Sequence, residues 1–273
     1  MGKVNFDISG QIAVVTGAGG IICSQMAKDL SKVGVKVALL DIMVDKAQEI
    51  ADEINQSGGE AAAFKVDVLN KESIEETCKQ VLDRFGTIDI LINGAGGNKA
   101  QATTSADLSF FDLPNDALQW VFNLNLVGTI LPTQVFGKVL AQKGKGNIIN
   151  VSSMNCYRPL TRVPAYSAAK AGISNFTQWL ATHMAQEYST NIRVNAIAPG
   201  FLLTQQNYFL MVDKDTGEPT PRGHKVLGNT PMGRYGEPEE LSGAIIYLCS
   251  EAASFITGVV LPIDGGFSAF SGV

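Results

Sequence analysis

The sequence predicts an α/β fold with one doubly wound parallel sheet of about seven strands and helices on both faces. Short, nearly continuous apolar runs alternate with longer amphipathic stretches along all 273 residues. A glycine-rich loop joins the first apolar run to the first amphipathic stretch. Strands that are apolar on both sides must be covered by helices on both faces, so this alternation indicates a Rossmann-type domain.

Seven apolar runs have the length and composition of buried strands. They cover residues 12–15, 35–40, 61–66, 88–92, 147–151, 192–197 and 259–263. The intervening stretches are long enough for the helical crossovers that parallel strands require.

Three helices near the beginning of the chain carry boundary signals. The first runs from the glycine loop to about residue 33, where Gly34 ends it. A polar helix at about 43–56 is closed by two glycines, and Asn70 is the predicted N-cap of the next helix. Apolar residues then recur at helical spacing, namely Ile74, Cys78, Val81, Leu82 and Phe85.

Two stretches interrupt the alternation of apolar runs and amphipathic stretches, at about 97–116 and about 202–236. Both are rich in polar and turn residues and both follow strands. In a doubly wound sheet they lie over the carboxyl ends of the strands, where ligands bind. We therefore expect a single domain over residues 1–273, with the second stretch as a substrate lid.

Composition and charge exclude several classes of protein. The formal net charge is −5 and the basic residues are scattered, which argues against nucleic-acid binding. The beginning of the chain lacks the apolar core of a signal peptide, and no uninterrupted apolar run approaches the roughly 18 residues of a membrane span. We expect a cytoplasmic protein that binds neither nucleic acid nor membrane.

The cysteines and histidines do not predict a metal site. The four cysteines are far apart, with no CxxC spacing, and the two histidines stand outside any ligand-like cluster. We expect free thiols in a reducing compartment and no bound metal.

The first glycine loop, residues 16–23, directly follows a strand and precedes a helix. Glycine lets the backbone approach a pyrophosphate, and the helix N-terminus supplies N–H donors. A tight strand-to-helix turn is the alternative reading. The loop residues predicted to bind a dinucleotide are Gly17, Gly19, Gly20, Ile21 and Ile22.

Asp41 ends the second strand 24 residues after Gly17. A carboxylate there accepts hydrogen bonds from a ribose diol and repels a 2′-phosphate, so the sequence predicts NAD rather than NADP. Asp67 follows the third strand, where it either reaches the adenine or serves as a turn residue before the Asn70 cap. Ile42 and Val68 adjoin these two carboxylates and complete the predicted adenosine site.

Tyr166 and Lys170 are four residues apart and share one face of a helix. Free tyrosine has a pKa of about 10, and a neighbouring ammonium together with a nicotinamide ring favours the phenolate. Alone, such a pair is also common on helix surfaces. Ser153 lies 13 residues before Tyr166, after a strand, where its hydroxyl could hold a substrate oxygen.

These motifs resemble the short-chain dehydrogenase/reductase family over essentially the whole chain. The resemblance rests on TGAGG at 16–20, NGAG at 93–96, Asn125 in NLVG, Ser153, YSAAK at 166–170, Pro199-Gly200 and DGG at 264–266. It implies an Asn125–Ser153–Tyr166–Lys170 tetrad, with Ser153 orienting the carbonyl, Tyr166 exchanging the proton, Lys170 binding the nicotinamide ribose and Asn125 anchoring a water relay. It also implies a homotetramer. The further cofactor contacts that it implies are Asn93, Gly94, Ala95, Gly96, Pro199, Gly200, Phe201 and Thr204.

The glycine loop departs from the family's TGxxxGxG pattern. Ile21 and Cys23 occupy the second and third glycine positions. A side chain at 21 crowds a pyrophosphate unless Gly19 and Gly20 shift the loop.

The unusual loop sequence is similar to that of one sugar-acid branch of the family, the D-mannonate oxidoreductases or fructuronate reductases. The segments that carry this narrower likeness are TGAGGIICS, AGGN at 95–98, SSMNCYRPLTRVPAYSAAK, TQQN at 204–207 and TPMGRYGEPEEL. A hexuronate needs a cation for its carboxylate and polar partners for its hydroxyls. The proposed partners are Asn98, Ser153, Asn155, Arg158, Tyr166, Gln205 and Asn207.

Arg158 is the first candidate for the carboxylate, with Arg162 and Arg222 behind it. The alternative for each arginine is an ion pair at the surface or at a subunit interface. Trp120 and Trp179 are interpreted as core or interface packing.

Three rival functions stay open. A gluconate 5-dehydrogenase would use the same side chains for a carboxylate and a polyol. A 3-oxoacyl-carrier-protein reductase is disfavoured because the chain lacks a basic docking patch. A non-catalytic NAD-binding regulator has no need for the Tyr166–Lys170 proton pair.

Overall fold

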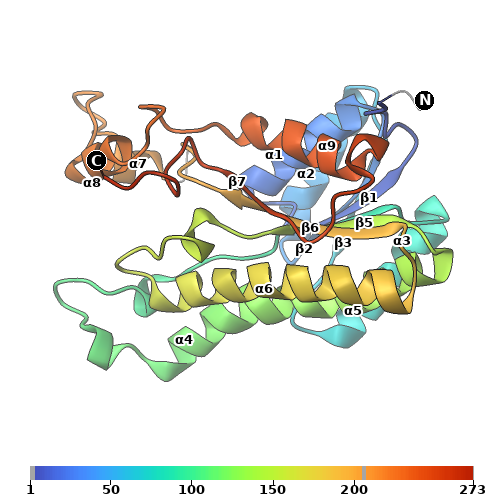
Figure 1. Cartoon of the computed structure of the whole chain (residues 1–273), viewed down its shortest axis with the longest axis horizontal. Helices are drawn as coiled ribbons and strands as arrows, with labels where there is room; N and C mark the ends of the chain where they lie inside the picture. The colour runs from blue at the N-terminus through green and yellow to red at the C-terminus, as the bar shows by residue number, and fades with distance from the viewer. Residues whose placement is uncertain (1–3, 205–206, 273) are drawn as a thin grey trace.

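The computed structural model describes residues 4–204 and 207–272. Its centre is a seven-stranded sheet in the order β3-β2-β1-β4-β5-β6-β7, with every neighbouring pair parallel (Figure 1). The strands are β1 Ile12–Thr16, β2 Lys36–Asp41, β3 Ala61–Lys65, β4 Ile90–Asn93, β5 Gly146–Val151, β6 Ile192–Pro199 and β7 Val260–Ile263. This architecture confirms the predicted single doubly wound domain.

Helices cover both faces of the sheet (Figure 1). The α-helices are α1 Ile21–Lys32, α2 Val44–Gln56, α3 Lys71–Phe85, α4 Asn115–Phe122, α5 Gly128–Lys143, α6 Pro164–Glu187, α7 Tyr208–Met211, α8 Pro221–Gly228 and α9 Ser242–Cys249. Short turns of other helix types are η1 Ala100–Ala102, η2 Phe110–Asp112, η3 Asn123–Val127, η4 Met154–Cys156, η5 Pro238–Leu241 and η6 Glu251–Ala253.

The core has two halves because successive side chains of a strand point to opposite faces. Ala13 and Val15 of β1 pack with residues of α1, α2 and α9 on one face. Val14 packs with residues of α3, α5 and α6 on the other. Strands that are buried on both sides explain the continuous apolar runs of the sequence.

Local capping signals act as predicted. The Asn70 side chain accepts a hydrogen bond from the Ser73 N–H at 3.1 Å and begins α3. Gly34 follows the C-cap Val33 of α1 with a φ of 83°, the left-handed conformation that glycine adopts at low cost.

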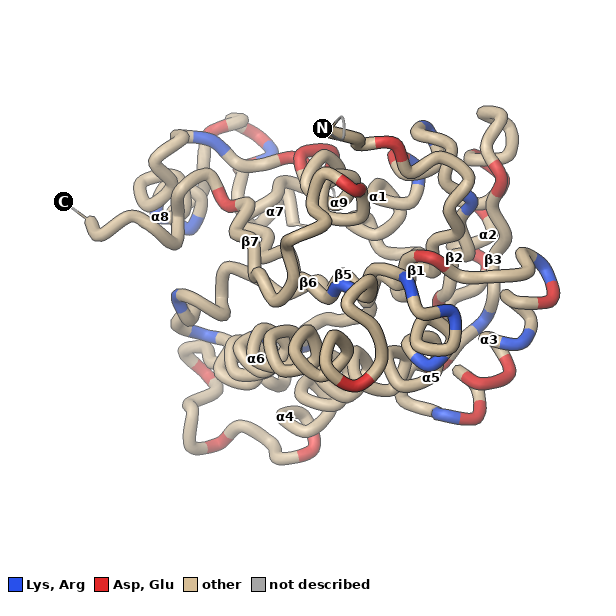
Figure 2. Tube along the Cα trace, turned by 45° about the vertical axis from the view of Figure 1, so that its right-hand side comes forward, with Lys and Arg blue, Asp and Glu red and all other residues tan. Residues whose placement is uncertain are grey.

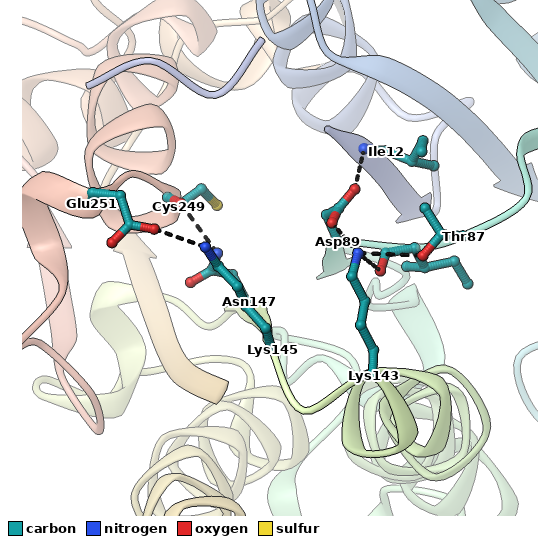
Figure 3. Close-up of polar contacts among 9 residues, drawn as sticks. Ile12, Thr87, Asp89, Lys143, Lys145, Asn147, Cys249 and Glu251 are labelled. Atoms are coloured by element: carbon teal, nitrogen blue, oxygen red, sulfur yellow. Dashed lines mark hydrogen bonds and ion pairs between the residues drawn. The ribbon is translucent and has the colours of Figure 1, made fainter. Parts of the chain in front are cut away.

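Polar contacts fix the amino end of the strands (Figure 3). The Asp89 carboxylate accepts from the Ile12 N–H at 2.9 Å and pairs with Lys143. The Asn147 amide donates to the Cys249 carbonyl at 3.1 Å. Strand β4 begins directly after Asp89, at Ile90 rather than at 88.

The two ends of the segment expected as a lid are hydrogen-bonded to each other. Leu202 and Gly236 form a parallel bridge, and the Leu203 N–H donates to the Gly236 carbonyl at 2.9 Å. Helices α7 and α8 lie within the segment and project from one end of the molecule (Figure 1).

One helical run among the described residues, Asn115–Lys143, is long and apolar enough to cross a membrane by length and composition. Here it comprises α4, the π-helical turn η3 and α5. Phe136 and Leu140 of α5 are fully buried in the core beneath the sheet. The run is packed as a core helix of this domain.

Candidate active site

A cavity of about 610 Å³ lies at the carboxyl edge of the sheet, where the strand order reverses between β1 and β4. Open α/β sheets bind ligands at this point. The predicted residues that line it are Gly17, Gly20, Ile21, Ile22, Asp41, Ile42, Asp67, Val68, Gly94, Ala95, Gly96, Gly200, Phe201, Thr204 and Asn207. Sequence reasoning missed Cys23, Met43, Val66, Leu124 and Leu202, which also line it and carry no polar signal.

The glycine loop forms one wall of the cavity. Gly17 has a φ of 69°, and a Cβ there would lie 2.8 Å from the Cα and N of Ala95. Helix α1 begins at Ile21 after the N-cap Gly20, and no side chain caps it. Its N-terminal N–H groups therefore suit an anionic group, and the loop fits the pyrophosphate of a dinucleotide.

The unusual residues of the loop are accommodated by a neighbouring glycine. A Cβ on Gly94 would lie 2.1 Å from the Cys23 Sγ, so the sulfur occupies room that the absent Cβ leaves. Ile21 lies on the cavity wall. Burial raises the pKa of the Cys23 thiol to about 12, which keeps it protonated and a poor nucleophile at neutral pH.

Asp41 is 7% exposed and holds the loop as well as facing the cavity. Its Oδ2 accepts from the Gly19 N–H at 2.9 Å, and its Oδ1 accepts from the Met43 N–H at 2.8 Å. A carboxylate has about four lone-pair sites, so acceptor capacity remains for a ribose hydroxyl. The contact with Gly19 was not foreseen from the sequence.

Asp67 is a turn residue that also lies at the cavity. Its Oδ1 accepts from the Leu69 N–H at 2.9 Å, as a turn residue does. It also lines the cavity.

The structure brings Ser153, Tyr166 and Lys170 together at the carboxyl end of β5. The Ser153 hydroxyl faces the Tyr166 phenol and interacts with it. The Lys170 Nζ lies 5.5 Å from the centre of the Tyr166 ring and donates to the Val151 carbonyl at 2.7 Å. A Cβ on Gly96 would lie 3.5 Å from that Nζ, so the lysine lies beside Gly96, which lines the cavity, whereas Ser153, Tyr166 and Lys170 do not line it themselves.

Burial dominates the titration of both groups in the protein without cofactor. It raises the pKa of Tyr166, and the interaction with Ser153 opposes the rise. Burial lowers the pKa of Lys170 to about 8. Desolvation of the phenol dominates this state, and the shift toward the phenolate that the sequence argument assigns to Lys170 together with the nicotinamide ring stays a prediction for the cofactor-bound protein.

Asn125 is fully buried in η3, a π-helical turn between α4 and α5. Its Nδ2 donates to the carbonyls of Gly97 at 2.7 Å and Val121 at 2.8 Å. Its Oδ1 accepts from the Gly97 N–H at 3.2 Å. The side chain thus fixes the loop after β4 beside Lys170, and a π turn at such a position is frequent at functional sites.

Several predicted contacts do not line this cavity, Gly19 among them. Asn93 is buried behind the site and donates to Thr133 and Asn150 at 2.9 Å, so its side chain does not line the cavity. Pro199 ends β6 and also stands outside the lining. Asn98 is exposed and donates to Thr103 at 2.8 Å.

The polar residues of the lid segment hold its base. Asn207 accepts from the Thr204 N–H and donates to the Leu202 carbonyl, each at 2.8 Å. Gln205 lies outside the described residues.

Arg158 is exposed, and its Nε donates to the Ser268 carbonyl at 3.0 Å, which ties its loop to the C-terminal segment. Arg162 and Arg222 are also exposed. Within residues 4–204 and 207–272, none of the three forms an ion pair with a carboxylate. Asn155 is 4% exposed, donates its N–H to the Ser153 Oγ at 3.3 Å, and lines a different cavity.

Among the described residues, no group of three His, Cys, Asp or Glu side chains could hold a metal ion. All four cysteines are free.

Comparison with known proteins identifies the family. Residues 17–268 match the family described as Enoyl-(Acyl carrier protein) reductase. A crystal structure of a candidate D-mannonate oxidoreductase from Haemophilus influenza, with bound NAD, is 52% identical, covers 98% of each chain and has a TM-score of 0.92. An uncharacterized oxidoreductase from Bacillus subtilis, UxuB, is 47% identical over 276 residues, 98% of each chain. A candidate NAD(P)-dependent gluconate 5-dehydrogenase from Beutenbergia cavernae is 30% identical, with a TM-score of 0.84 over 97% of this chain and 99% of its own. The chain therefore belongs to the short-chain dehydrogenase/reductase family, a family of oxidoreductases that act on CH–OH groups.

Proposed function

We propose that this enzyme uses NAD(H) to interconvert D-mannonate and D-fructuronate. The observation that carries the proposal is the Ser153–Tyr166 pair beside Lys170, next to a cavity that Asp41 faces. The pair suits proton exchange at the oxygen of a secondary alcohol or ketone. The cavity suits a dinucleotide.

The residues divide the chemistry with the cofactor. A bound nicotinamide cofactor supplies or accepts the hydride at the carbon. In the direction of reduction, Ser153 donates a hydrogen bond to the ketone oxygen, and Tyr166 gives that oxygen its proton. Lys170 presents a buried ammonium beside Tyr166, which stabilises the phenolate left behind. Asn125 holds the loop that faces Lys170.

Asp41 supports a preference for NAD over NADP. Its carboxylate is 7% exposed and faces the cavity, where a 2′-phosphate would meet a fixed negative charge. The bound NAD of the Haemophilus influenza relative agrees with this preference.

The substrate assignment rests on the relatives and on the polar residues of the loops. The Haemophilus influenza relative is described as a candidate D-mannonate oxidoreductase. Arg158 follows the Ser153 strand end and lacks a carboxylate partner in the described chain, so it is the proposed partner of the substrate carboxylate. Gluconate 5-dehydrogenase activity is the second candidate function, and the similarity to the Beutenbergia cavernae relative favours it.

We further propose a cytoplasmic homotetramer that assembles partly through α6. Apart from Lys170 and Glu187, α6 carries no charged residue, as Figure 2 illustrates. Trp179 on this helix is 57% exposed and stacks on His183 with ring centres 4.8 Å apart. This exposure excludes the core alternative for Trp179 and favours the interface alternative. Light scattering should give a tetramer mass for the wild type and a smaller one for Trp179→Glu.

The function is tested by following NADH loss with D-fructuronate, D-tagaturonate, 5-ketogluconate and an acetoacetyl thioester. We expect preference for D-fructuronate, loss of turnover by a factor of about 10²–10⁴ in Tyr166→Phe, and unchanged NADH binding in that variant. Preference for 5-ketogluconate would assign the enzyme to the gluconate reaction. If none of these substrates is turned over although NADH binds, the alternative of a non-catalytic NAD-binding regulator would be supported.

Arg158→Met tests the carboxylate contact. It should raise KM for the sugar acid at least about tenfold while leaving NADH binding unchanged, because a charge-assisted pair is lost. An unchanged KM would exclude Arg158.

A further inference from the structure

Two consecutive serines follow β5, and only the second of them, Ser153, takes part in the proposed reaction. The first, Ser152, is 2% exposed and lies outside the lining of the cofactor cavity. Its N–H donates to the Ile197 carbonyl of β6 at 2.8 Å, so the pairing of the two strands continues past the end of β5. The sheet therefore fixes the backbone of Ser152.

The Ser152 side chain reaches the helix that carries Tyr166 and Lys170. Its hydroxyl donates to the Lys170 carbonyl at 3.0 Å and is hydrogen-bonded to the Ser174 hydroxyl at 2.8 Å. Tyr166, Lys170 and Ser174 are spaced four residues apart on α6, so they form one stripe of the helix. Ser152 thus contacts the same stripe that carries the proton-handling pair.

Lys170 is attached to the end of β5 at two points. Its Nζ donates to the Val151 carbonyl at 2.7 Å, and its own carbonyl accepts from Ser152, the next residue of the chain. A buried polar contact whose members are all bonded rigidifies the parts that it joins. The contact with Ser152 therefore fixes the main chain of α6 against the strand end that leads into Ser153.

We propose that Ser152 is a positioning residue of the reaction, which holds α6 so that Tyr166 and Lys170 meet the Ser153 hydroxyl and the substrate oxygen. This role rests on the proposed function and acts through Lys170. A displacement of about 1 Å at such a site can slow catalysis about a hundredfold. The attraction between the ammonium and a phenolate also falls as the two groups move apart.

A second contact between β5 and α6 provides a matched control. The Asn150 Nδ2 donates to the Thr177 Oγ1 at 2.9 Å, about two turns of α6 beyond Lys170. Asn150 is fully buried, so Thr177→Val leaves its amide N–H without that acceptor. Ser152→Ala is milder for stability, because the Lys170 carbonyl keeps the bond from the Ser174 hydroxyl at 3.1 Å.

The first test compares kcat and stability in the two variants of the full chain. With D-fructuronate and saturating NADH, Ser152→Ala should lower kcat about tenfold and Thr177→Val less than about twofold. Urea unfolding should show the opposite order, with the larger loss of stability in Thr177→Val. A merely structural role of Ser152 predicts instead that kcat follows stability in both variants.

The second test needs no turnover. The ionisation of Tyr166 is followed by the ultraviolet difference spectrum of tyrosinate in the NAD complex, after subtraction of the Tyr166→Phe complex. Ser152→Ala should raise the midpoint by about half a pH unit or more, because the ammonium is held less firmly beside the phenol. Thr177→Val should leave it unchanged. Cys23 and Cys156 also act electrostatically on the ammonium, and both variants retain them.

A raised midpoint together with a loss of kcat in Ser152→Ala, and neither change in Thr177→Val, supports the positioning role. A wild-type midpoint in Ser152→Ala overturns it, whatever the turnover, as do losses of kcat that follow stability in both variants. If the wild type does not reduce D-fructuronate, the proposed function fails in that assay, and the tyrosinate midpoint still decides the role of Ser152.

Discussion

Replacing Lys170 by Met removes a buried charge whose cost depends on pH. Lys170 is 4% exposed, and burial lowers its pKa from 10.5 to about 8. At about 1.4 kcal/mol per pH unit, holding this lysine protonated in the folded protein costs about 3 kcal/mol.

The sign follows from the protons bound in each state. Between pH 8 and 10.5 the unfolded lysine stays protonated while the folded one loses its proton, so stability rises with pH across this window. Below pH 8 both states are protonated and the full cost applies. From pH 7 to pH 10 the contribution of Lys170 to the free energy of unfolding should improve by about 2.5 kcal/mol.

The assay is urea unfolding of the wild type and Lys170→Met at equal protein concentration, at pH 7 and pH 10, followed by tryptophan fluorescence. In Lys170→Met the hydrogen bond to the Val151 carbonyl is lost, and this loss offsets part of the gain in stability. The offset applies at both pH values, because a neutral amine also donates this bond. The difference in the free energy of unfolding between the two proteins is compared at pH 7 and pH 10, and its change with pH isolates the effect of the charge. If that difference is the same at pH 7 and pH 10, the pKa of Lys170 is not lowered and the reasoning fails.

Three further predictions concern the cofactor site and the fold. Asp41→Asn should raise the ratio of kcat/KM for NADPH over NADH at least about fivefold, because one negative charge facing the cavity is removed; an unchanged ratio would contradict the charge argument. Gly17→Ala should destabilise the protein by about 2 kcal/mol or more and weaken NADH binding, because its Cβ meets the Ala95 backbone. Gly58→Ala is the matched control, since it has a similar positive φ but nothing within 4 Å, and should cost only about 1 kcal/mol without affecting NADH binding; equal losses in both variants would refute the clash. Asn70→Ala should cost about 1 kcal/mol in urea unfolding through loss of the α3 cap, with NADH binding unchanged, and a cost near zero would show that the cap is dispensable.

Most of the fold could be predicted because its signals are local. The buried parallel strands are continuous apolar runs, and the cap at Asn70 and the turn at Gly34 follow from residue type. Strand ends were harder to predict, as β4 shows: it begins at Ile90, and the Asp89 carboxylate just before it accepts a hydrogen bond from the Ile12 N–H. That contact joins residues 77 apart and leaves no local pattern.

The site was predicted where motifs carry it and missed where contacts cross the fold. Gly17, Gly20 and Asp41 line the cavity as expected, whereas Gly19 does not. The bond from Gly19 to Asp41 depends on how α1 meets β2, and the π turn around Asn125 depends on packing between α4 and α5. Burial likewise raises the pKa of Tyr166 in the protein without cofactor, an effect that the sequence does not reveal because desolvation is a property of the folded environment.

The contact between Cys23 and Gly94 restricts the order in which this loop can change during evolution. With Cys23 present, a methyl group at 94 would meet the sulfur at 2.1 Å, so Gly94→Ala is barred. With glycine at 23, the sulfur is gone and the closest remaining neighbour of that methyl group is the Thr16 carbonyl oxygen at 3.0 Å, a tight but far smaller conflict. A lineage moving toward the family's usual glycine at this position can therefore change residue 23 first and residue 94 second, but not in the reverse order. The two positions should vary as a coupled pair, with the sign of the second substitution set by the first.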